Sequence, residues 1–104
     1  MLSRKNRRRY LAVLYEPNKS QTQVMRDIQG RFMELFGCLA TELAYLRVYN
    51  SKQNGILILS CDLEYLERIL FTIAMMDQSM TVVMMSGTIR KLRERLIQSE
   101  IRLN

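Results

Sequence analysis

Short apolar segments and longer segments of helical periodicity follow one another along the 104 residues of this chain. The first, residues 8–16, reads RYLAVLYE from Arg9 and is followed by a Pro-Asn turn. Its side chains are apolar on both faces of a strand: Tyr10, Ala12 and Leu14 on one, and Leu11, Val13 and Tyr15 on the other. An apolar residue at every position is typical of a strand covered on both sides. We therefore expect a central strand.

The next segment has the start and stop signals of a helix. Ser20 and Gln23 have the spacing of a capping box, in which the hydroxyl and the amide satisfy backbone N–H groups. The periodicity predicts a helix over about 21–36 that ends at Gly37. Its expected buried face consists of Val24, Ile28, Phe32, Leu35 and Phe36.

A hairpin, a second helix and another strand are predicted for the middle of the chain. Residues 41–49 alternate and predict a strand, Asn54-Gly55 predicts a tight turn, and residues 56–61 return as an apolar strand. Asp62 is expected to cap a helix. The buried stripe of that helix is expected to be Leu63, Leu66, Leu70, Ile73 and Ala74. Residues 80–85 form the fourth predicted strand.

A last helix is predicted over about 86–100, with Ile89, Leu92, Leu96 and Ile97 on its apolar side. The order β-α-β-β-α-β-α predicts an α+β fold, the ferredoxin-like or RRM-like sandwich with an antiparallel sheet and an extra C-terminal helix. We expect strand order 4-1-3-2, with the last helix partly covering the face opposite the two crossover helices. Residues 1–9 read as a basic arm, and residues 10–104 as one domain.

Charge is concentrated at the two ends of the chain. Sixteen Lys and Arg against ten Asp and Glu give a net charge of +6. The basic excess lies in two groups: Arg4, Lys5, Arg7, Arg8 and Arg9, and Arg90, Lys91, Arg93, Arg95 and Arg102. If the ends meet in space, they form a docking surface for a polyanion such as RNA. The alternative is a disordered arm and a solvated helix face.

The composition argues against an active site or a membrane segment. Without histidine, the usual catalytic triads and the commonest metal ligand are absent. Asp62, Glu64 and Glu67 have the positions of helix-start charges, and we expect no metal or cofactor bound by the protein itself. The longest nearly apolar run, residues 69–76, is too short for a bilayer. Cys38 and Cys61 are expected to be buried, reduced thiols in a cytoplasmic protein.

Three further groups are candidates for binding. Ser86, Gly87 and Thr88 open a basic helix, which suits a phosphate, although an ordinary N-cap explains them equally. The predicted third strand carries no aromatic ring, so recognition through phosphates and shape is expected rather than base stacking. Weaker candidates for a protein interface are the row Tyr45, Arg47 and Tyr49 on an edge strand, and methionines that include Met84 and Met85; a solvated edge and core filling are the alternatives.

Four features in order resemble one known family. They are Arg9-Tyr10, Leu35-Phe36-Gly37, Gly55-Ile56-Leu57, and the run Ser86-Gly87-Thr88-Ile89-Arg90-Lys91. This pattern is similar to protein component 2 of archaeal ribonuclease P, a family shared with a small subunit of the eukaryotic ribonucleases P and MRP. One departure is Ile58, which stands where an arginine commonly follows Gly-Ile-Leu, so no RNA contact is assigned to that strand.

The resemblance implies a non-catalytic, RNA-binding subunit of the ribonuclease P endoribonuclease. The catalytic RNA, with Mg²⁺, would cleave the 5′ leader from precursor tRNA. Precursor tRNA would be an indirect partner of the protein. It also implies a larger, barrel-fold protein partner and assembly as a two-plus-two heterotetramer. The alternatives are a protein-interaction or small-ligand regulatory domain of the same fold, and an enzyme in its own right.

Overall fold

The computed structural model describes residues 7–16, 18–76 and 80–103. Its elements follow one another as β1 (Arg8–Tyr15), α1 (Gln21–Ala44), β2 (Arg47–Tyr49), β3 (Ile56–Asp62), a 3₁₀ turn (Leu63–Tyr65), α2 (Leu66–Met75), β4 (Met80–Ser86) and α3 (Ile89–Leu103).

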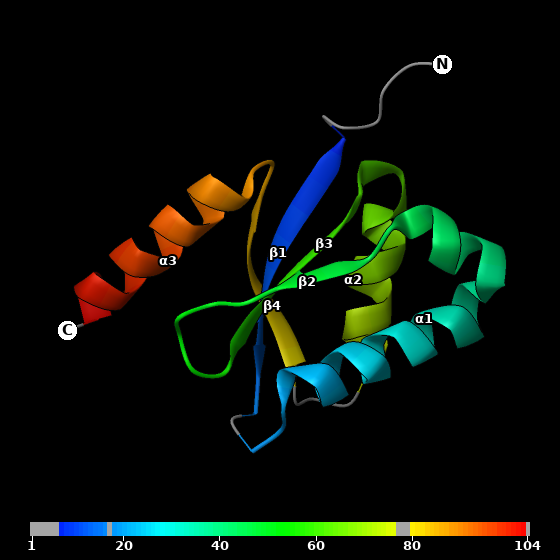
Figure 1. Ribbon diagram of the computed structural model, residues 1–104, viewed down its shortest axis with the longest axis horizontal. Coiled ribbons are helices and arrows are strands. Elements are labelled where there is room, and N and C mark those ends of the chain that lie inside the picture. Colours follow the sequence, from blue (N-terminus) through cyan, green and yellow to red (C-terminus); the bar gives the residue numbers. More distant parts are fainter. Residues whose placement is uncertain (1–6, 17, 77–79, 104) are drawn as a thin grey trace.

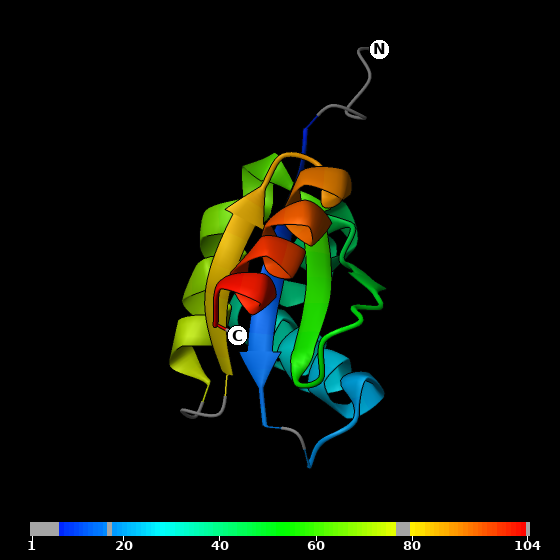
Figure 2. The same cartoon turned by 90° about the vertical axis from the view of Figure 1, so that its left-hand side faces the viewer.

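The four strands form one antiparallel sheet in the order β2-β3-β1-β4, which confirms the predicted topology. The central position of β1 explains why both of its faces are apolar: α1 and α2 cover one face, and α3 covers the other in part (Figure 1), leaving Leu14 45% exposed. Helices α1 and α2 lie on one side of the sheet and α3 on the other (Figure 1). Figure 2 shows α3 running across the sheet, over β1. The fold is therefore the expected α+β sandwich with an added C-terminal helix.

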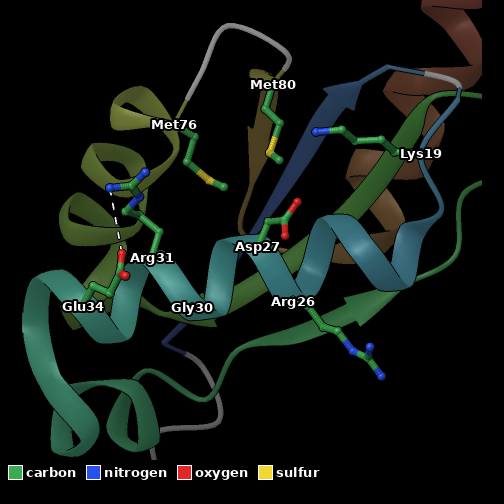
Figure 3. A pocket seen from close by; sticks show the side chains of 8 residues that line it. All are labelled: Lys19, Arg26, Asp27, Gly30, Arg31, Glu34, Met76 and Met80. Atoms are coloured by element: carbon green, nitrogen blue, oxygen red, sulfur yellow. Dashed lines mark ion pairs between the residues drawn. The ribbon is translucent and has the colours of Figure 1, made fainter.

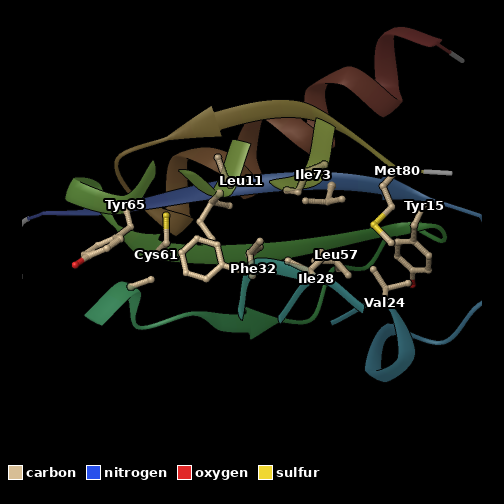
Figure 4. Close-up of a cluster of buried hydrophobic side chains, with 14 residues drawn as sticks. Leu11, Tyr15, Val24, Ile28, Phe32, Leu57, Cys61, Tyr65, Ile73 and Met80 are labelled. Carbon is tan, nitrogen blue, oxygen red and sulfur yellow. The ribbon is translucent and has the colours of Figure 1, made fainter. Parts of the chain in front are cut away.

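The larger core lies between the sheet and the helices α1 and α2 (Figure 4). Leu11 and Val13 of β1 and Leu57 and Leu59 of β3 face it. From α1 it receives the predicted stripe Val24, Ile28 and Phe32, all fully buried. Ser20 begins this helix as predicted, and its hydroxyl accepts a hydrogen bond from the Gln23 N–H at 3.1 Å.

A second, smaller core lies beneath α3. Here Ala12 of β1 and Ile58 of β3 pack against Leu92 and Leu96, with Tyr10, Tyr49, Ile56, Met84 and Ile89 around them. The predicted seam of the last helix is confirmed for Leu92 and Leu96. Ile97, by contrast, keeps 48% of its surface exposed.

The structure corrects the end of the first helix. At Gly37 the backbone leaves the helical region (φ 92°, ψ 172°), but a second helical stretch then continues to Ala44. The predicted strand over residues 41–46 is therefore wrong, because Ala40, Leu43 and Ala44 instead present a helical i, i+3, i+4 face to the core. Leu35, which precedes the kink, is exposed rather than buried.

The second helix differs from its prediction in its first turn and in its buried stripe. Asp62 does cap it, accepting a hydrogen bond from the Glu64 N–H at 3.0 Å, but the first turn is a 3₁₀ turn. The tighter turn rotates the helix, so Ile69 and Thr72 are buried and Ala74 is exposed.

The two cysteines occupy different environments. Cys61 is fully buried in the larger core, and this burial raises the pKa of its thiol to about 11, so it stays protonated near neutral pH. Cys38 follows the kink and is exposed, which makes the prediction of two buried thiols wrong.

The docking of α3 can be tested by truncating its buried leucine. We expect Leu92→Ala to lower the free energy of unfolding by about 2–5 kcal/mol, because it leaves a cavity between the helix and the sheet. Ile97→Ala on the same helix is the control and should change it by about 0.5 kcal/mol or less. Urea denaturation would measure both; equal costs would contradict the packing described.

The two glycines of α1 should respond to alanine with opposite signs. At Gly37 the positive φ is strained for any residue with a Cβ, so Gly37→Ala should destabilise the fold by about 1–3 kcal/mol. At Gly30 a Cβ would meet nothing within 4 Å. Gly30→Ala should therefore stabilise the helix by about 0.5–1 kcal/mol. Thermal unfolding of the two variants checks the sign of each change.

Candidate nucleic-acid interface

The two basic segments meet at one end of the sheet. Tyr10, near the start of β1, pairs with Ser86 at the end of β4. This register brings Arg9 beside the turn that opens α3, where its Nη1 atom lies 3.7 Å from the position that a Cβ on Gly87 would take. The convergence expected from the charge pattern therefore exists for Arg9 and the start of α3.

The turn itself is built as a helix cap. The Ser86 hydroxyl accepts a hydrogen bond from the Thr88 N–H at 3.3 Å, and the Thr88 hydroxyl accepts one from the Lys91 N–H at 3.2 Å. The ordinary N-cap explanation is therefore correct for Thr88, which directly precedes α3, whereas Ser86 stabilises the turn before it. It is compatible with anion binding, because the positive end of the helix dipole and the exposed Lys91 lie at the same place.

The fold does not require glycine at position 87. Gly87 does not have a positive φ, and an added Cβ would meet only the end of the Arg9 side chain, at an ordinary van der Waals distance. A bare backbone here leaves room for a ligand to approach the helix start closely.

The other N-terminal basic residues are arranged differently. Arg7 is exposed, whereas the Arg8 guanidinium turns across the sheet and donates a hydrogen bond to the Ser60 hydroxyl. The candidates Arg4 and Lys5 lie outside the described residues.

The arginines of α3 do not form one continuous surface. Arg90 extends into solvent beside Glu94, with 3.8 Å between Nε and Oε2. Arg93 donates a hydrogen bond to the Asn50 carbonyl at 3.2 Å, and Arg95 donates one to the Met85 carbonyl at 3.2 Å. Asn50 follows β2 and Met85 belongs to β4, so these two side chains leave the helix on opposite sides. Both help to hold α3 on the sheet.

The face of the sheet that could stack bases is largely covered. Ile58 of β3 is fully buried under α3, so this strand presents neither a ring nor an open surface. The nearest rings, Tyr10 and Tyr49, are half-buried and contact each other with 6.0 Å between centroids.

The predicted placement of Tyr45 on the edge strand is wrong. The extended α1 places Tyr45 at its C-cap in a left-handed conformation (φ 50°), before β2 begins. Arg47 and Tyr49 do lie on β2, which is an edge strand; Arg47 is exposed, and Tyr49 packs beside α3.

The methionine candidates divide in the same way. Met84 packs against the core under α3, as core filling predicts, whereas Met85 is exposed on the other edge strand, β4. On β4, Met85 is therefore accessible to a protein partner, whereas Met84 is engaged in the smaller core.

A hollow on the opposite side of the molecule carries mixed charge (Figure 3). Arg26, Asp27, Arg31 and Glu34 of α1 contribute to it, together with Lys19. Arg31 is 3.8 Å from Glu34, and the carboxylates largely cancel the cations. This hollow therefore has little preference for an anion.

Within the part of the chain that the structure describes, no helix is long and apolar enough to cross a membrane. Nor do three acidic, cysteine or histidine side chains gather there in a way that could hold a metal ion.

Comparison with known proteins supports the resemblance found in the sequence. A search of curated proteins gives no match. The model of the Rpp14/Pop5 family of ribonuclease P matches residues 9–97, which include the sheet, except for Arg8, and the part of α3 that packs on it. The match thus covers Arg9, the Ser86-Gly87-Thr88 turn and the structure that joins them. This chain belongs to the Rpp14/Pop5 family of ribonuclease P subunits.

Proposed function

We propose that this chain is a non-catalytic, RNA-binding subunit of ribonuclease P, which supports the catalytic RNA while the 5′ leader is cleaved from precursor tRNA. The observation that carries the proposal is the meeting of Arg9 with the Ser86-Gly87-Thr88 turn at the start of α3. Family membership supplies the enzyme to which the subunit belongs.

The geometry favours contacts to the RNA backbone. The start of α3 offers a positive helix end, Lys91 and the Arg9 guanidinium within one small area, and phosphate oxygens match such donors. Such contacts position an RNA without reading its bases.

The catalytic chemistry belongs to the RNA in this proposal. The Mg²⁺ ion that supports cleavage is likewise assigned to the RNA. Precursor tRNA is contacted indirectly, through the RNA. A barrel-fold subunit is the expected protein partner, in a two-plus-two heterotetramer, and the exposed Arg47 and Met85 on the two edge strands are candidates for its contacts.

Removing two cations at the start of α3 should weaken binding to a structured RNA. Neutralising phosphates releases counterions, so log affinity falls with log salt by about 0.7–0.9 per contact. We expect Arg9→Ala with Lys91→Ala to lower the affinity for ribonuclease P RNA and to reduce this slope by about two contacts. Filter binding over a range of salt concentrations measures both quantities.

The matched control removes two cations from the mixed-charge hollow on α1, Arg26→Ala with Arg31→Ala. It changes the net charge equally but should leave the slope unchanged. A salt-independent affinity in the unaltered protein, or equal effects of the two double variants, would reject the proposal in favour of a protein-interaction domain.

Gly87→Ala provides a separate test of close approach by the RNA. A Cβ at this position fits the fold, so the melting temperature should stay nearly unchanged while RNA affinity falls several-fold, because the added methyl group obstructs the helix start. Circular dichroism and filter binding on the same preparation separate the two effects. Unchanged affinity would place the RNA away from this turn.

A further inference from the structure

We propose that the hollow between the β2–β3 loop and α3 binds one unpaired nucleotide of an RNA. This inference extends the proposed function by naming a second contact of a different chemistry. The loop connecting β2 to β3 lies on the same side of the sheet as α3 (Figure 1), and the hollow between them has a volume of about 400 Å³. That volume is in the range of small-ligand sites.

The floor of the hollow is apolar. Ile58 of β3 and Leu96 of α3 lie beneath it and are 0% and 4% exposed, so the apolar surface that a ligand can reach is mainly the wall formed by Ile97, which is 48% exposed. Ile97 follows the packed seam of α3 but belongs to neither buried core. A planar, weakly polar group such as a nucleobase would cover this surface.

The rim of the hollow is positively charged. Lys52 stands on the loop and Arg93 on the helix, and none of the described residues lining the hollow is acidic. The hollow on α1 contrasts with it, because there Asp27 and Glu34 accompany the cations. Charge therefore selects an anionic ligand at the α3 hollow, and a nucleotide carries its phosphate next to its base.

The polar groups of the rim are held in place. The Ser51 hydroxyl accepts a hydrogen bond from the Gln53 N–H at 3.0 Å, which fixes the loop, and Arg93 ties the loop to α3 through the Asn50 carbonyl. The side-chain amide of Asn50 suits the edge of a base, and the planar guanidinium of Arg93 suits its face. A base in a duplex is already paired and stacked, so the ligand must be unpaired.

The site can be tested by nuclear magnetic resonance titration of the full ¹⁵N-labelled chain. A single-stranded adenosine hexanucleotide should shift the amide signals of residues 50–53 and 93–97. Adenosine 5′-monophosphate should shift the same signals but bind with at least tenfold lower affinity, because the neighbouring phosphates of the strand add charge contacts. Ribose 5-phosphate, which lacks a base, should leave them unchanged.

Two matched double variants separate this site from general charge. Lys52→Gln with Ile97→Ser should lower the affinity for the hexanucleotide by about tenfold, the loss expected when a base loses its stacking surface. Lys19→Gln with Met75→Ser makes the same chemical changes away from α3, at an exposed methionine, and should have little effect.

The outcomes distinguish this proposal from the proposed function. If ribonuclease P RNA binds through Arg9 and Lys91 but the hexanucleotide shifts no signal in the hollow, the nucleotide site is overturned and the RNA-binding function stands. Equal shifts from ribose 5-phosphate would reduce the hollow to an anion site and overturn the proposal. Equal affinity for the monophosphate and the hexanucleotide would identify a free nucleotide as the ligand and overturn it as well.

Discussion

The packing of α3 on the sheet is the contact on which the functional surfaces depend. Leu92 and Leu96 cover Ala12 and Ile58, and this burial of apolar area fixes the helix in one orientation. With α3 in that position, its start lies beside Arg9 and its second half forms one side of the hollow with the β2–β3 loop. If α3 were detached from the sheet, the chain would carry the same charges, but they would no longer lie in fixed positions relative to one another.

A covered sheet face also determines how this fold can meet RNA. RRM-like domains that read single strands use rings on the middle strands of an open sheet. Here β3 carries isoleucine and leucine instead, and α3 takes the place where bases would lie. Under the proposed function, RNA would therefore contact the margins of the helix: its positive end, where phosphates fit, and the hollow along its side.

The sequence predicts the strand order well because the apolar pattern within a short segment already indicates how far that segment is buried. The two apolar faces of β1 indicate a central strand, and the Ser20 cap marks the start of α1. The prediction fails after Gly37, where the alternating residues 41–46 also fit a helical face, and only packing against the core decides between helix and strand. The hollow beside α3 has no local signal at all, because Lys52 and Ile97 become neighbours only when the helix docks.

The placement of the arginines shows why a count of basic residues overstates an RNA interface. Arg8, Arg9, Arg93 and Arg95 each donate a hydrogen bond to the protein itself: Arg8 to the Ser60 hydroxyl, and the others to the carbonyls of Arg8, Asn50 and Met85, respectively. A guanidinium has five N–H groups, so one such bond leaves donors for a phosphate but fixes the direction from which the phosphate can approach. In the proposed function, these arginines would both stabilise the domain and face its RNA. The number of phosphates that they could contact would then depend on this geometry more than on the net charge of +6.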